Sequence, residues 1–148
     1  MTVIAPMTRV HIGELMPYEI EMFGTEAWSA DGYRDELSDT RHRRYVVALD
    51  DGGALLGWAG VRVLGETGEI LTVGVIPAAR RRGVGRRLLT ELLDEARSRG
   101  AAEVFLEVRA DNEAAQTLYR VEGFSVVGLR RGYYDHGRLD AVTMRMPL

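Results

Sequence analysis

Short strand-like runs and longer helix-like stripes alternate along the hydrophobic pattern of this chain. Apolar residues are concentrated in Arg44–Leu49, Ala54–Val63 and Glu69–Ile76. The Asp51-Gly-Gly53 turn separates the first two runs and is typical of a β-hairpin. We therefore expect three neighbouring strands, with Glu69–Ile76 as the central one.

A long helix is predicted after the central strand, because apolar residues recur there at helical spacing. The stripe comprises Val84, Leu88, Leu89, Leu92, Leu93 and Ala96. Gly100 is typical of a helix C-terminus, and Glu103–Val108 has the pattern of a further strand. Strand, helix and strand over residues 69–108 form one right-handed crossover, which predicts a parallel strand pair.

The two ends of the chain carry weaker patterns. Polar and apolar residues alternate over Thr8–Ile12, which indicates a short first strand. The other expected elements are helices at Met16–Phe23, Asp31–Ser38 and Asn112–Glu122 and a last strand pair at Phe124–Leu129 and Leu139–Met146. The whole pattern predicts an α/β (α+β) fold, with a mixed central sheet flanked by helices, in one domain over residues 1–148.

Composition and charge narrow the class of protein. The 148 residues are 46% hydrophobic and 28% charged, which is ordinary for a globular domain. A net charge of −3 argues against a general nucleic-acid binder. Cysteine is absent, the three histidines are scattered, and neither a membrane-length apolar run nor a signal-peptide pattern is present. We expect a soluble, cytoplasmic protein without a metal site or membrane association.

The segment Arg80-Arg-Arg-Gly83-Val-Gly85-Arg-Arg87 joins the central strand to the long helix. Its two glycines allow a sharp turn close to a ligand, and the first N–H groups of the helix have no intrahelical partner. The arginines add forked donors that match phosphate oxygens, so the segment is suited to hold an anion. Its spacing fits neither Walker A, which needs a lysine that this chain lacks, nor the dinucleotide-binding fingerprint. A plain helix cap with solvated arginines is the alternative interpretation.

A carboxylate, an amide and a phenol follow in the next strand and helix. Glu107 shares a strand face with Phe105 and must meet a cleft or a counter-charge, for which Arg109 is the simplest candidate. Asn112 is a suitable helix cap, and Tyr119 lies seven residues later on the same helical face. Both could contact an extended ligand beside the helix. Alternatively, Asn112 only caps the helix and Tyr119 only fills the core.

Taken together, these segments resemble the GCN5-related N-acetyltransferase (GNAT) superfamily. The glycine turn has the R-x-x-G-x-G pattern of its pyrophosphate loop, and residues 106–124 match L-E-V-R-x-x-N-x-x-A-x-x-L-Y-x-x-x-G-F. With Arg130-Arg-Gly-Tyr-Tyr134 and a final Asp140-Ala-x-x-Met144, the similarity covers residues 44–146. It is close to the RimI branch, whose members acetylate the N-terminal amine of a ribosomal protein.

The resemblance implies a role for each matching position. It implies the GNAT acyl-CoA N-acyltransferase fold, with the parallel strand pair at the cofactor cleft and acetyl-CoA as the cofactor. Glu107 stands at the position of the general base and Tyr119 at that of the general acid. The implied cofactor-binding residues are Val73, Val75, Arg80, Arg81, Arg82, Gly83, Val84, Gly85, Arg86 and Asn112. The implied substrate-binding residues are Trp28, Tyr133 and Tyr134.

The implied activity is acetyl transfer to the N-terminal α-amine of a protein, in this branch a small-subunit ribosomal protein. Ala27-Trp28-Ser29 is similar to the Pro-Trp-Ser loop of the family, although Ala27 replaces the proline and Arg80 stands where glutamine is common. Two other functions remain open: acetylation of a small-molecule amine or a lysine side chain, and an arginine-rich nucleic-acid-binding module. We expect a protein or peptide N-terminus as partner, no direct nucleic acid, and a monomer ahead of an oligomer.

Overall fold

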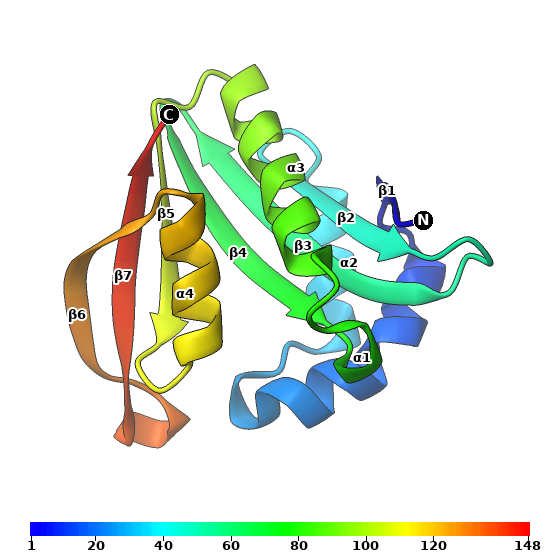
Figure 1. The fold of residues 1–148 in the computed structure, drawn as a ribbon, viewed down its shortest axis with the longest axis horizontal. Coiled ribbons are helices and arrows are strands. Elements are labelled where there is room, and N and C mark those ends of the chain that lie inside the picture. Colours follow the sequence, from blue (N-terminus) through cyan, green and yellow to red (C-terminus); the bar gives the residue numbers. More distant parts are fainter.

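Seven strands form one mixed sheet in the computed structural model, which describes all 148 residues, and helices cover both of its faces (Figure 1). The sheet order is β1-β2-β3-β4-β5-β7-β6. The strands are β1 (Val3–Pro6), β2 (Arg43–Leu49), β3 (Leu55–Leu64), β4 (Thr67–Val75), β5 (Glu103–Arg109), β6 (Ser125–Tyr134) and β7 (Leu139–Pro147). The helices are α1 (Arg9–Phe23), α2 (Ala30–Ser38), α3 (Val84–Ser98) and α4 (Glu113–Glu122), with short 3-10 turns η1 (Gly24–Glu26), η2 (Pro77–Ala79) and η3 (Asp135–Gly137). Helices α3 and α4 lie on the near face in Figure 1, and α1 and α2 lie behind the sheet.

Strands β4 and β5 form the parallel pair that the crossover predicted, and they separate after a short contact. Only three positions pair, the last being Glu69 with Phe105. Beyond that point β4 continues to Val75 and β5 to Arg109 without pairing with each other, and Figure 1 shows the two strands diverging. The divergence leaves a gap in the middle of the sheet with two unpaired main-chain edges.

The phase of the β3–β4 pairing decides which β4 groups face this gap. The Ile76 N–H donates to the Leu56 carbonyl of β3 at 3.0 Å. Successive residues of a strand direct their N–H and C=O groups alternately to opposite sides. The main-chain N–H and C=O groups of Gly74 therefore point toward β3, as those of Ile76 do, whereas those of Val73 and Val75 point toward the gap.

The main core lies between the sheet and α3. Every residue of the predicted α3 stripe is buried, namely Val84, Leu88, Leu89, Leu92, Leu93 and Ala96. On the opposite face of the sheet, Trp58 of β3 is fully buried against Gly74, where a Cβ would lie 2.5 Å from the indole. The N-terminus of α3 is thereby held beside the end of β4.

The predicted first strand at Thr8–Ile12 is wrong, because most of that segment is the first turn of α1 and the first strand lies earlier. Ile12, Leu15 and Glu19 recur at helical spacing and form the buried face of α1. An alternation over five residues is compatible with one turn of such a helix, so the local pattern was ambiguous.

Two further boundaries differ from the prediction. The predicted helix Met16–Phe23 begins too late, because α1 starts at Arg9 and includes Pro17 in its interior. Strand β6 continues beyond the expected Phe124–Leu129 to Tyr134, because pairing with β7 resumes after a register shift. No helix is both long and apolar enough to span a bilayer. The single-domain expectation remains a prediction, which the continuity of one sheet from β1 to β7 supports.

Candidate active site

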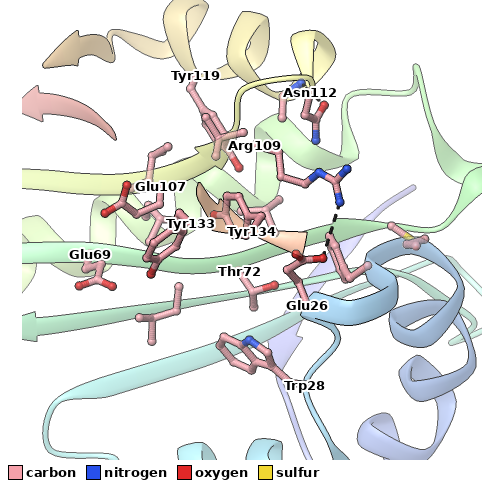
Figure 2. Close-up of a pocket in the computed structure, with 18 of the residues that line it drawn as sticks. Glu26, Trp28, Glu69, Thr72, Glu107, Arg109, Asn112, Tyr119, Tyr133 and Tyr134 are labelled. Carbon is pink, nitrogen blue, oxygen red and sulfur yellow. Dashed lines mark hydrogen bonds and ion pairs between the residues drawn. The ribbon is translucent and has the colours of Figure 1, made fainter. Parts of the chain in front are cut away.

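The gap between β4 and β5 is a cleft of about 620 Å³ (Figure 2). Its walls come from β4, β5 and α4, from the end of α1 and the chain after it, and from the end of β6. Of the predicted site residues, the cleft brings together Trp28, Val73, Glu107, Asn112, Tyr119, Tyr133 and Tyr134. Residues that are separated by about a hundred positions in the sequence thus share one cavity.

Glu107 is held on β5 with its carboxylate at the cleft. Its neighbours Leu106 and Val108 are buried on the opposite strand face, which turns Glu107 away from the core. The Thr143 hydroxyl donates to Glu107 Oε2 at 2.7 Å, and Arg130 Nε lies 3.2 Å from Oε1. The side chain keeps 22% of its surface exposed, so it can still meet a substrate. The alternative of an ion pair between Glu107 and its neighbour in the sequence, Arg109, is not what the structure has.

Asn112 and Tyr119 stand at opposite ends of α4. Asn112 caps the helix, as its residue type predicted, by accepting the Ala115 N–H at 3.1 Å. Tyr119 is only 8% exposed and packs edge-on against Phe124. Burial raises the pKa of Tyr119 to about 12. Figure 2 shows its side chain reaching toward the cleft, and its hydroxyl makes no hydrogen bond within the protein, so its proton is available to a ligand.

A pair of aromatic rings closes the cleft on the β6 side. The Tyr133 and Tyr134 rings pack edge to face with centroids 4.9 Å apart, and the Arg130 guanidinium lies 5.1 Å from the Tyr133 centroid. Burial, and then the nearby charges of Tyr133 and Glu107, raise the pKa of Tyr134 above its usual value. The Tyr134 phenol therefore stays protonated beside the carboxylate, where it can donate a hydrogen bond.

Glu26 joins the two sides of the cleft mouth, which the sequence did not indicate. Its carboxylate accepts the Asp135 N–H at 2.5 Å and lies 3.6 Å from Arg109 (Figure 2), which also pairs with Asp111 at 3.0 Å. Burial acts to raise the pKa of Glu26, but hydrogen bonds from Thr25 and Asp135 and the charge of Arg109 hold it below its usual range. Since Glu26 and Asp135 are 109 residues apart, no local motif could have paired them.

Glu19 is a second residue that the sequence interpretation missed. It lines the cleft from α1, is only 2% exposed, and accepts the Trp28 N–H at 3.1 Å. Its position on the buried helical face with Ile12 and Leu15 was the available signal, because a carboxylate on a core-facing stripe needs a partner. That signal was lost once α1 was predicted to begin at Met16.

The predicted glycine turn lies at the other end of β4 and is not part of the cleft wall. Arg81 and Gly83 adopt left-handed conformations, with φ of 62° and 77°. Six consecutive N–H groups, residues 81 to 86, donate to no acceptor in the protein. Such a run of main-chain donors at a helix N-terminus is a concave site for an anion.

Side chains add positive charge around these main-chain donors. Arg80, Arg81 and Arg82 are exposed, while Arg86 pairs with Glu122 at 2.7 Å. A Cβ on Gly85 would lie 3.3 Å from the Leu118 side chain, so the turn packs closely against α4. The turn follows the strand whose open edge lines the cleft, an arrangement that suits an extended, anionic ligand.

The sequence decides the family, because residues 13–124 match the Acetyltransferase (GNAT) family. The chain belongs to the GNAT family. It is 46% identical over 147 residues to the N-alpha-acetyltransferase RimI of Mycobacterium tuberculosis, covering 96% of this chain and 90% of that protein. It is 39% identical over 115 residues to the [Ribosomal protein bS18]-alanine N-acetyltransferase of Escherichia coli, covering 76% of this chain and 78% of that one.

Solved GNAT structures agree with the fold. The crystal structure of the ribosomal-protein-S18-alanine N-acetyltransferase from Escherichia coli superposes with a TM-score of 0.86 at 30% identity, covering 99% of this chain and 94% of that one. The resemblance drawn from the sequence and the GNAT fold class are therefore confirmed. The chain is an acetyl-CoA-dependent N-acetyltransferase. Its residues fit that cosubstrate, because six free N–H groups suit a diphosphate and an open strand edge suits the pantetheine amides.

Proposed function

We propose that this GNAT enzyme acetylates the N-terminal α-amine of a protein, namely a small-subunit ribosomal protein. The observation that carries the proposal is the cleft between β4 and β5, in which a carboxylate and a phenol meet a pair of tyrosines. The named activities of the Mycobacterium tuberculosis and Escherichia coli relatives support it.

The main chain of β4 and of the glycine turn would hold acetyl-CoA. The N–H groups of residues 81 to 86, helped by the Arg80 and Arg82 side chains, would bind its diphosphate. The free edges of Val73 and Val75 would pair with the pantetheine arm, with the N–H near Val73 polarising the thioester carbonyl. Asn112 would contact the arm from α4. Bound in this way, acetyl-CoA supplies the activated acetyl group.

Glu107 would accept the proton of the attacking amine, directly or through water. An α-amine with a pKa of about 7.7–8.0 loses its proton near neutral pH at a cost of roughly 1 kcal/mol. A lysine with a pKa of about 10.4 needs roughly 4.6 kcal/mol. A carboxylate held at the cleft by Thr143 and Arg130 is therefore better matched to an α-amine than to lysine.

Tyr119 would hydrogen-bond the departing sulfur as the carbon–sulfur bond breaks. Its pKa of about 12 lies well above that of a thiol, about 8.5, so complete proton transfer is uphill by roughly 5 kcal/mol. The phenol therefore acts mainly as a hydrogen-bond donor to the thiolate, which takes its proton from solvent.

A peptide panel analysed by mass spectrometry tests this proposal. Each peptide carries one internal lysine and begins with a free or a formylated alanine, and a polyamine and an aminoglycoside are assayed beside them. We expect the acetyl group on the free α-amine and no product from the formylated peptide. Because this chain has no lysine, any acetyl-lysine signal comes from the peptide. Acetylation of lysine or of the small amines, without α-amine product, would overturn the proposal.

A further inference from the structure

Glu19 of α1 is the one carboxylate of the protein that is almost completely buried. Burial raises its pKa, although hydrogen bonds from Tyr33 and Trp28 oppose the shift. A charge at such a position is costly unless several donors satisfy it. The proposed reaction gives Glu19 no task, so the donors that surround it indicate its role.

Two donors from different segments converge on this carboxylate. The Tyr33 hydroxyl of α2 donates to Oε1 at 2.5 Å, and the Trp28 N–H donates to Oε2 at 3.1 Å. Glu19 is the only hydrogen-bond acceptor that the Trp28 N–H has in the protein.

The other side of Tyr33 connects this cluster to the sheet. The Trp58 indole N–H donates to the Tyr33 oxygen at 3.0 Å, so the hydroxyl is committed to donating to Glu19. Trp58 itself is locked by packing, with Gly74 on one side and an edge-on contact to Phe23 on the other. At the sheet, the cluster is therefore anchored by the packing of Trp58. At its other end, the position of the Trp28 main chain depends on the hydrogen bond to Glu19.

We propose that Glu19 is a positioning residue, which holds the segment Ala27–Ser29 so that Trp28 forms the wall of the cleft that receives the first residues of the peptide. The inference rests on the proposed function, because it assigns that wall to the peptide. Trp28 lines the cleft and packs on Tyr33 with ring centroids 5.0 Å apart. The two Glu19 oxygens accept hydrogen bonds from Trp28 and Tyr33, so we assign the carboxylate a role through these residues rather than in the reaction itself.

Loss of the Glu19 carboxylate should displace the segment Ala27–Ser29 but leave β4, the proposed cofactor-binding strand, in place. In Glu19→Met the Trp28 N–H has no acceptor and the segment moves to find water, whereas packing keeps Trp58 against β4. We expect the KM for the peptide to rise about tenfold or more, while the KM for acetyl-CoA changes by less than about twofold. Glu19→Gln keeps one oxygen for the Trp28 N–H and should restore part of the loss.

Glu21→Met is the matched control, because Glu21 is exposed on the same helix and makes no ion pair or hydrogen bond. It should leave both KM values unchanged. Amide exchange at Trp28 should be faster in Glu19→Met and unaltered in the control, which reports on the segment independently of activity. If Glu19→Met does not fold, Tyr33→Phe serves as the test variant. It removes one of the two hydrogen-bond donors to Glu19 and should raise the KM for the peptide but not the KM for acetyl-CoA.

The outcomes separate this inference from the proposed function. A wild-type enzyme that acetylates no α-amine contradicts the proposed function. If the wild type acetylates the peptide but Glu19→Met, or Tyr33→Phe in its place, leaves the peptide KM unchanged, Glu19 has no positioning role. Equal rises in both KM values would also overturn the inference, because they indicate a general loss of structure.

Discussion

Glu107 and Tyr119 face the same cleft from different surroundings. Glu107 is oriented by Thr143 and by Arg130, whose guanidinium also covers Tyr133. Tyr119 has no such partner, and its ring is fixed by packing alone. A carboxylate that is already hydrogen-bonded is pre-oriented to accept a proton, and a free phenol keeps its hydrogen for the leaving group.

Replacing Tyr119 by phenylalanine tests the role of that hydroxyl. The ring still fills the buried site, so the fold and the affinity for acetyl-CoA should be retained. We expect kcat to fall about a hundredfold, which is typical when one hydrogen-bond donor to a developing negative charge is lost. Single-turnover rates and calorimetric affinities measure the two effects separately. An unchanged rate of the chemical step would remove Tyr119 from the mechanism.

The pH dependence adds an independent check on this residue. Because burial raises the pKa of Tyr119 to about 12, the phenol stays protonated up to about pH 11. Between about pH 8 and 10, the kcat of the wild type should therefore vary with pH in the same way as the kcat of Tyr119→Phe. A fall of kcat in that range in the wild type, but not in Tyr119→Phe, would show that the phenol has a pKa well below about 12.

At the scale of elements, β4, the glycine turn and the start of α3 act as one unit. The strand offers main-chain groups along its open edge, and the turn presents six N–H groups from residues 81 to 86. Two left-handed residues, Arg81 and Gly83, shape this turn, and only the second is a glycine. Main-chain donors held in this way need no rearrangement when an anion arrives.

Two substitutions separate the main-chain from the side-chain contribution to acetyl-CoA binding. Gly83→Ala introduces a Cβ at a φ of 77°, which costs about 1–2 kcal/mol and draws the turn away from its binding shape. We expect about tenfold weaker binding by calorimetry. Arg81→Gly suits the φ of 62°, keeps the N–H groups and should weaken binding less. The opposite order would show that arginine charge, rather than the main chain, holds the diphosphate.

The elements that the sequence predicted well are those with a strong local period. The α3 stripe is buried throughout, and the crossover over residues 69–108 gives the parallel pair. The start of α1 could not be placed, because the alternation over Thr8–Ile12 is compatible with a strand as well as with the first turn of the helix. The length of β6 depends on pairing with β7 across register shifts, which no local pattern records.

The candidate site was predictable only where a motif covers it. The glycine turn, Glu107, Asn112 and Tyr119 stand at fixed motif spacings, and the structure brings the last three into one cleft. The contact of Glu26 with Asp135 and the Glu19 cluster depend on side chains that meet only in the folded protein. Their residue types are ordinary at these positions, and tertiary packing alone gives them their partners.

At the scale of the whole molecule, we propose that β4 links an anion site at its end to a reaction cleft along its open edge, so that binding of the diphosphate places the thioester beside Glu107 and Tyr119. The proposed substrate side of the cleft is formed by other segments, namely the chain after α1 and the end of β6. Binding and chemistry therefore depend on different residues along one path.

Calorimetric titration with acetyl-CoA and with S-acetylpantetheine, which lacks the diphosphate, tests this claim most directly. We expect acetyl-CoA to bind at least about a hundredfold more tightly, because charge-assisted hydrogen bonds to the turn are lost with the diphosphate. In Gly83→Ala, the difference in affinity between acetyl-CoA and S-acetylpantetheine should be smaller. Equal affinity for both ligands, or no binding of acetyl-CoA at all, would contradict the account.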